Sequence, residues 1–132
     1  MFDVEEFSRG LPGGFFVYEA TGEEKLLYVG DSLVKMFKCK NKDEFREWVG
    51  NSFRGIVHPD DLERAEQEIH DQQFELPENT NNMDYVRYRI QCKDGTVKTV
   101  DDFGHLVHDK NYGMVYYVFL LDLDEHVFKG RL

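Results

Sequence analysis

The chain has 132 residues, which is enough for one folded domain and too few for two of ordinary size. Its 26 acidic and 16 basic residues give a net charge of −10, which argues against nucleic acid or an anionic membrane surface as a partner. Hydrophobic residues make up 41% of the chain, so it can form a core. No apolar run approaches the roughly 18 residues of a membrane span and no signal-peptide pattern opens the chain, so we expect a cytoplasmic location without membrane insertion.

The acidic surplus is concentrated in one segment. Between Val57 and Asp84 there are nine acidic residues and one basic residue, Arg64, which is a local charge of −8. We interpret this segment as a solvated outer helix face. The alternative is a docking face for a basic partner or for lysines of another subunit, namely Lys35, Lys38, Lys40 and Lys42.

The first half of the chain predicts a helix, a hairpin and several short helices. Residues 2–11 form an amphipathic helix with Val4, Phe7 and Leu11 on one face. Short β-type runs at residues 14–20 and 25–30 are joined by a tight turn.

Asp31 and Ser32 are N-cap residues for a helix that carries Leu33, Met36 and Phe37, and Asn41 caps a second helix with Phe45, Trp48 and Val49 on one face. A kinked stretch at 50–57 leads into a helix that starts at His58-Pro59 and ends near Phe74. Its inward side chains are Leu62, Ala65, Ile69 and Gln73.

The second half predicts three strands connected by turns. Residues 84–92 alternate cleanly, with Val86, Tyr88 and Ile90 on one face, and turns at 93–95 and 108–113 bound a long strand. The last strand, 114–123, is apolar at nearly every position, as in a central strand covered on both faces. Two strands, a block of helices and a three-stranded meander together predict an α+β fold with an antiparallel sheet.

With these elements in place, the sequence resembles the PAS domains of bacterial signalling proteins over residues 11–124. The motifs that carry the resemblance are Leu11-Pro12-Gly13-Gly14-Phe15-Phe16, Leu27-Tyr28-Val29-Gly30-Asp31, His58-Pro59-Asp60-Asp61, Lys93-Asp94-Gly95-Thr96, Asp101-Asp102-Phe103-Gly104 and Asp122-Leu123-Asp124. The resemblance implies a five-stranded antiparallel sheet with short helices between its second and third strands. This chain departs from the family pattern at two positions: family members often carry Asn where Gly30 stands and Thr where Asp124 stands.

The resemblance implies a sensory or dimerising domain rather than an enzyme. We expect a flanking helix at 1–10, the PAS domain at 11–124 and the start of an output linker at 125–132. The implied output domain is a diguanylate cyclase (GGDEF) domain, with a histidine kinase as the alternative. Asp122 and Asp124 mark the signal exit.

The residues argue against the familiar PAS cofactors. A flavin photoadduct needs a cysteine, usually within Asn-Cys-Arg-Phe, and the corresponding segment here has Ser52 at that position. Cys39 and Cys92 lie elsewhere, and we expect both to be buried free thiols. His70 could ligate haem, but its acidic, hydrophilic surroundings favour a solvated histidine. We therefore predict no cofactor and no metal.

A pocket between sheet and helices is implied by the fold. The residues expected to face it are Phe53, Ile56, Tyr88, Ile90, Val100 and Val118. Two interpretations stay open: these residues contact a small molecule, or they fill the core, which the eleven Phe and seven Tyr make easy. Tyr88 needs a partner for its hydroxyl if it is buried.

The partner that we expect is a second copy of the chain, bound through Val4, Phe7 and Leu11 and the sheet. One rival hypothesis is a ligand-free structural dimerisation domain. Another is a small enzyme that uses a buried carboxyl with a raised pKa, such as Asp102. Asp101 and Asp102 point to opposite faces of their strand, so they do not form a catalytic pair.

Overall fold

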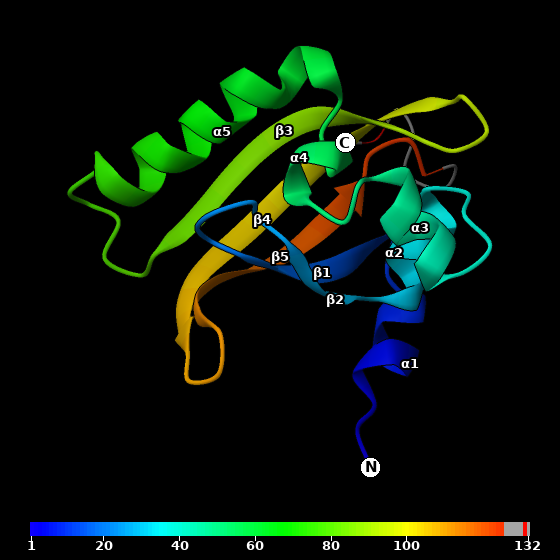
Figure 1. Cartoon of the computed structure of the whole chain (residues 1–132), viewed down its shortest axis with the longest axis horizontal. Helices are drawn as coiled ribbons and strands as arrows, with labels where there is room; N and C mark the ends of the chain where they lie inside the picture. Colours follow the sequence, from blue (N-terminus) through cyan, green and yellow to red (C-terminus); the bar gives the residue numbers. More distant parts are fainter. Residues whose placement is uncertain (126–130, 132) are drawn as a thin grey trace.

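The computed structural model describes residues 1–125 and 131. The elements in chain order are α1 (Val4–Arg9), β1 (Gly13–Glu19), β2 (Leu26–Val29), α2 (Asp31–Met36), α3 (Lys42–Trp48), α4 (Phe53–Ile56), α5 (Pro59–Phe74), β3 (Met83–Gln91), β4 (Val97–Asp109) and β5 (Gly113–Asp122) (Figure 1). Most of the segment predicted as the output linker, 126–130 and 132, lies outside the described residues.

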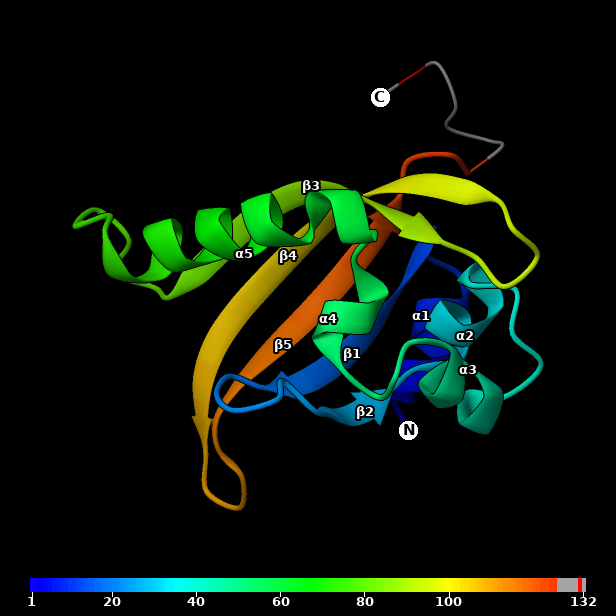
Figure 2. The ribbon, with the colours of Figure 1, turned by 45° about the horizontal axis from the view of Figure 1, so that its top comes forward.

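The five strands form one antiparallel sheet in the order β2-β1-β5-β4-β3. The helices α2 to α5 all lie between β2 and β3 in the chain, and Figure 2 shows α4 and α5 over one side of the sheet, with α5 along β3. We call this covered side the inner face. The predicted α+β fold, with a block of short helices between the second and third strands, is confirmed.

Alternation along β3 is confirmed, because every second residue is buried. Val86, Tyr88 and Ile90 face the core, while Tyr85 and Arg87 are exposed. The central position of β5 is also confirmed. Its predicted cover on both faces is wrong for the described residues, because the Tyr117 side chain remains 47% exposed on the outer face.

Of three local predictions about the helices, two need correction and one is confirmed. The N-cap of α2 is Gly30, and the Asp31 N–H donates to the Glu5 carboxylate of α1 (3.1 Å), so a distant side chain supplies the cap. Trp48 does not pack inward with Phe45: it is 42% exposed and its indole N–H donates to the Gln91 carbonyl (3.0 Å). The Asn41 cap is confirmed, since its side chain accepts from the Glu44 N–H.

Helix α1 is shorter than the predicted 2–11, and its one buried residue is Ser8. The side chains of Val4, Phe7 and Leu11 are all exposed, so they do not cover the sheet of their own chain. Among the described helices, none is long and apolar enough to span a membrane.

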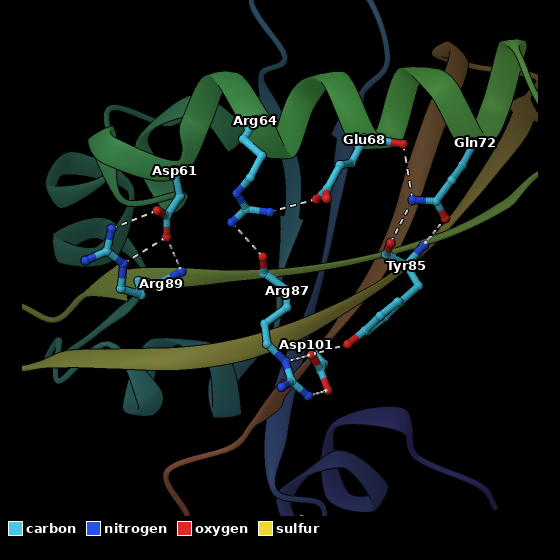
Figure 3. Close-up of polar contacts among 8 residues, drawn as sticks. All are labelled: Asp61, Arg64, Glu68, Gln72, Tyr85, Arg87, Arg89 and Asp101. Carbon is cyan, nitrogen blue, oxygen red and sulfur yellow. Dashed lines mark hydrogen bonds and ion pairs between the residues drawn. The ribbon is translucent and has the colours of Figure 1, made fainter.

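Polar side chains of α5 run along the free edge of β3 (Figure 3). The Asp61 carboxylate accepts hydrogen bonds from the Arg89 backbone N–H (2.8 Å) and its guanidinium (2.8 and 3.0 Å). Arg64 donates to the Arg87 carbonyl (2.9 Å). An edge strand carries unpaired backbone groups, and these contacts satisfy several of them. They also fix α5 over the inner face.

Candidate functional site

A cavity of about 180 Å³ lies between α5 and the inner face of the sheet. It is lined by Tyr18, Ala20, Glu24, Phe53, Glu66, Ile69, His70, Phe74 and Tyr116. These residues come from β1, the turn after it, α4, α5 and β5. The cavity therefore forms only when three distant parts of the chain, 18–24, 53–74 and the β5 strand, are assembled.

Stacked aromatic rings form one wall of this cavity. The Tyr18 ring stacks on Phe53 with centroids 4.5 Å apart and on Tyr116 with centroids 5.0 Å apart. The Phe53 ring also meets Tyr88 edge-on at 6.2 Å. Such stacks hold the rings in fixed positions and add to the stability that burial provides. The hydroxyl-bearing rings are thus held rigidly at the inner face.

Two carboxyl groups, Glu24 and Glu66, face each other at the cavity. Burial, reinforced by the neighbouring Glu66 carboxyl, raises the pKa of Glu24 to about 7, and Arg54 opposes the shift. The Arg54 guanidinium donates to Glu24 (2.8 Å) and stands 3.9 Å from Glu66. Two acids this close disfavour double ionisation, so one of them retains a proton near neutral pH.

A third acid, Asp102, lies in the core on the inner face of β4 and is only 1% exposed. The Tyr88 hydroxyl donates to its Oδ2 (2.7 Å), while Oδ1 is buried without a hydrogen-bond partner among the described residues. Burial, opposed by the Tyr88 hydrogen bond and reinforced by the charge of Asp84, raises the pKa of Asp102 to about 8. The Tyr88 hydroxyl thus has the partner that its burial requires.

Asp84 lies diagonally across the inner face from Asp102 and accepts from the Gln73 amide (2.7 Å). Burial raises its pKa, and the Gln73 hydrogen bond opposes that shift. Gly104, its partner on β4, makes room for it, because a Cβ there would collide with the Asp84 carboxylate.

The acidic segment is therefore not only a solvated helix face. Asp61 is engaged by Arg89, Glu66 lines the cavity and Asp84 is buried on the inner face. The other six acids of the segment are exposed, in agreement with the original interpretation.

All six residues predicted for the pocket are buried, with exposed fractions of 5% or less. Phe53 lines the inner cavity, and Tyr88 reaches it indirectly through its edge contact with Phe53 and its bond to Asp102. Ile56, Ile90, Val100 and Val118 belong to the hydrophobic core. Sequence reasoning missed Tyr18, Glu24, Glu66 and Tyr116. The one available signal was the inward parity of Tyr18 and Tyr116 on their strands.

A hollow of about 690 Å³ lies on the opposite, outer face of the sheet. One row of aromatic residues crosses four strands there: Tyr85, Phe103, Phe119 and Phe15 are successive cross-strand partners. Tyr117 and Tyr28 add to the same surface, and the Phe15 and Tyr28 rings stack at 5.4 Å. Monomeric soluble proteins rarely expose contiguous apolar surface of this kind.

The predicted signal-exit residues are held by specific contacts. Lys98 donates to Asp122 Oδ2 (2.7 Å), and Asp122 Oδ1 accepts from the Asp124 N–H (2.9 Å). Asp124 in turn accepts from the Thr99 N–H (2.9 Å), and the Asp122 N–H donates to the Pro12 carbonyl (2.7 Å). The entry and exit of the domain are thus joined.

The residues considered for cofactors have other roles in the described chain. Ser52 caps α4 by accepting from the Arg54 N–H (3.2 Å), and the Cys39 and Cys92 thiols are buried free thiols, as expected. His70 is exposed at the rim of the cavity, with its ring against Phe74. No cluster of potential metal ligands is found among the described residues.

The family model described as PAS fold matches residues 30–120 of the sequence. The chain belongs to the PAS fold family. The match covers α2 to α5, β3, β4 and most of β5, and it leaves out α1, β1 and β2. The family that the motifs indicated is therefore confirmed.

Solved structures similar to this PAS domain come from several kinds of signalling protein. A PAS domain from a two-component sensor histidine kinase is 13% identical, with a TM-score of 0.63 over 90% of this chain and 92% of that one. The N-terminal domain of a diguanylate cyclase with PAS/PAC sensor from Marinobacter aquaeolei is 18% identical, with a TM-score of 0.58 over 86% and 99%.

A Rhodobacter sphaeroides LOV protein is 12% identical, with a TM-score of 0.64 over 95% of this chain and 70% of that chain. No curated protein matches the sequence. Identities this low show the shared fold alone, so function has to be argued from the residues.

Proposed function

We propose that this PAS domain is a cytoplasmic regulatory unit, spanning residues 11–124, that controls an attached output domain by dimerising and by binding a small molecule at its inner face. The observation that carries the proposal is the pairing of an open aromatic surface on one side of the sheet with a cavity lined by aromatic rings and two carboxyl groups on the other. A ligand on one face and a partner on the other can be coupled through the same five strands.

Dimerisation is supported by the outer face. Phe103 and Tyr117 are 46% and 47% exposed at the centre of the sheet, and Val4, Phe7 and Leu11 add exposed apolar side chains. A second copy of the chain offers the same surface, so a symmetric interface would bury both at once. The partner that we propose is therefore another copy of this domain.

Ligand binding is supported by the inner cavity, which one of the six predicted pocket residues, Phe53, lines. The other five are buried in the hydrophobic core: Ile56, Tyr88, Ile90, Val100 and Val118. A ligand held there would contact α5 and the sheet at once, and so would bias their packing. Asp102 has the burial and the raised pKa that the rival enzyme hypothesis required, but it does not line the cavity. We therefore propose that it acts only indirectly, through its charge and its bond to Tyr88, and not in catalysis.

The output domain that we propose is a diguanylate cyclase, with a histidine kinase as the alternative. The similar structures include a PAS domain from a sensor histidine kinase and the N-terminal domain of a diguanylate cyclase, and the signal would leave through Asp122 and Asp124 after β5. The sequence of the full-length gene product tests this part directly. An output domain of neither kind after residue 132 would contradict it.

Light scattering after size exclusion tests the dimer. We expect the chain to elute at twice its monomer mass, and Tyr117→Arg to produce a monomer because it places a charge in the aromatic surface. Leu76→Arg, in the exposed loop after α5, is the matched control and should stay dimeric. A wild-type monomer at every concentration would contradict the dimer and leave the ligand-binding part to its own test.

A further inference from the structure

Three side-chain atoms of the described residues are buried without a hydrogen-bond partner, and all three are acceptor oxygens: Glu66 Oε1, Gln73 Oε1 and Asp102 Oδ1. Leaving a buried acceptor unpaired costs about 1–3 kcal/mol. Each belongs to an element that faces the layer between α5 and the sheet. The layer between α5 and the sheet therefore has more buried hydrogen-bond acceptors than donors.

The charges of this layer also indicate that a positively charged donor group is missing. Four carboxyl groups, those of Glu24, Glu66, Asp84 and Asp102, lie in or beside this layer, and Arg54 is the one arginine or lysine among the described residues that forms an ion pair with any of them. Buried carboxylates need a positive partner or must retain protons. A group that supplies both positive charge and N–H donors would satisfy both requirements.

The size of the cavity restricts that group. Its volume of about 180 Å³ corresponds to roughly six waters at about 30 Å³ each. The aromatic rings of Tyr18, Phe53, Tyr116 and Phe74 offer apolar contact beside the polar side chains that line the same cavity. These dimensions and this lining suit a short alkyl chain that carries an ammonium group.

We propose that the cavity between α5 and the sheet binds a small protonated aliphatic amine, whose ammonium group lies between Glu24 and Glu66 and donates to Glu66 Oε1, the one of the three unpaired oxygens whose residue lines the cavity. This inference rests on the proposed ligand-sensing function and names the ligand class of the same cavity. Asp102, which is almost fully buried and has one free oxygen, supplies negative charge behind the aromatic wall.

Binding by this route displaces protons. Glu24 and Asp102 have raised pKa values because of burial, so in the ligand-free domain each holds a proton for much of the time at neutral pH. An ammonium group favours their ionised forms and expels those protons. Affinity should therefore rise as the pH is raised from 6 towards 8. The titratable and charged groups that face the layer are Tyr18, Glu24, Arg54, Glu66, His70, Asp84, Tyr88, Asp102 and Tyr116.

The test uses 1,4-diaminobutane, which has six heavy atoms, as the probe on the whole chain. We expect about 10 mM of it to raise the melting temperature at neutral pH. Equal concentrations of 1,4-butanediol, which has no charge, and of tetramethylammonium, which has no N–H, should not. Calorimetric titration in two buffers of different ionisation enthalpy should show proton release. A shift of the same size with tetramethylammonium would mean general screening of an acidic protein and would overturn the proposal.

Two matched pairs of variants locate the site. Glu66→Gln should weaken amine binding about tenfold, while Glu63→Gln, which removes the same charge from the exposed side of α5, should change it less than twofold. Asp102→Asn should also weaken binding, whereas Asp101→Asn on the outer face of β4 should not. Because Glu66 is half-buried, its variant keeps the test valid even if Asp102→Asn fails to fold.

Failure of the amine assignment and failure of the proposed sensing function give different results. If a compound of different chemistry stabilises the chain through the cavity and amines do not, the amine assignment is wrong and the sensing function stands. If no small molecule binds, both are wrong, and the ligand-free dimerisation domain becomes the better account.

Discussion

The carboxamide of Gln72 on α5 pairs with both backbone groups of Tyr85 on β3: its Nε2 donates to the Tyr85 carbonyl and its Oε1 accepts from the Tyr85 N–H, each at 2.8 Å (Figure 3). A side chain thus makes the two bonds that a neighbouring strand would make. Further along the strand, Asp61 accepts from the Arg89 N–H and Arg64 donates to the Arg87 carbonyl. The edge of the sheet is therefore closed by a helix that also forms one wall of the inner cavity.

Replacing Gln72 with alanine removes both bonds and leaves the Tyr85 groups to solvent. We expect Gln72→Ala to lower the free energy of unfolding by about 1–2 kcal/mol, which urea titration would measure. Hydrogen exchange at the Tyr85 amide should accelerate. Gln67→Ala is the matched control, because Gln67 bonds only to Asp71 on its own helix. Equal losses in the two variants would contradict a role for the edge contacts.

The Asp61–Arg89 pair predicts an acid-sensitive component of stability. Hydrogen bonds from the Arg89 side chain lower the pKa of Asp61 to about 2, against about 3.9 in an unfolded chain. The folded pKa is the lower one, so the contribution is present above about pH 4 and is lost as the pH falls towards 2.

Asp61→Asn removes that contribution. Because the Arg89 side chain is 45% exposed, we expect a loss of only about 1 kcal/mol at pH 7, which shrinks towards pH 2. Asp60→Asn, on the exposed side of the same helix turn, is the control. Urea titrations at several pH values test this. A loss that stays constant down to pH 2 would show that the charge of Asp61 is not the cause.

Asp102 predicts the opposite pH dependence. Burial raises its pKa to about 8, so between about pH 4 and pH 8 the folded chain keeps a proton that the unfolded chain has released. Stability therefore falls as the pH rises through this window. Asp102→Asn should raise the melting temperature by roughly 5 °C at pH 8 and by less at pH 5. A melting temperature that drops equally at both pH values would show that asparagine disrupts the Tyr88 contact.

Sequence patterns predicted the elements because their signals are local. Strict alternation placed Val86, Tyr88 and Ile90 on one face of β3, and the His58-Pro59 start placed α5 within a residue of its observed beginning. Local patterns also separated Asp101 from Asp102, since neighbouring residues on a strand point to opposite faces.

The cavity could not be predicted in the same way, because its residues become neighbours only through strand order. Tyr18 and Tyr116 meet because β1 lies beside β5, about 100 residues later in the chain. Glu66 had the same signature as the exposed acids around it. The cap of α2 was missed for a related reason: its acceptor, Glu5, belongs to another helix.

The exit of the domain gives the last prediction. Lys98 and Asp122 are 17% and 5% exposed and form a 2.7 Å ion pair, so removing the acid leaves a largely buried ammonium group without its partner. We expect Asp122→Ala to lower the free energy of unfolding by about 3 kcal/mol. Asp122→Asn should cost less, because its amide oxygen can still accept from the Asp124 N–H. Because the Asp124 N–H donates to the Asp122 carboxylate and the Thr99 N–H donates to the Asp124 carboxylate, hydrogen exchange should accelerate at both amides in the alanine variant, while β3 stays protected. Uniform acceleration across the sheet would instead mean that the pair stabilises the whole domain and does not specifically hold its exit.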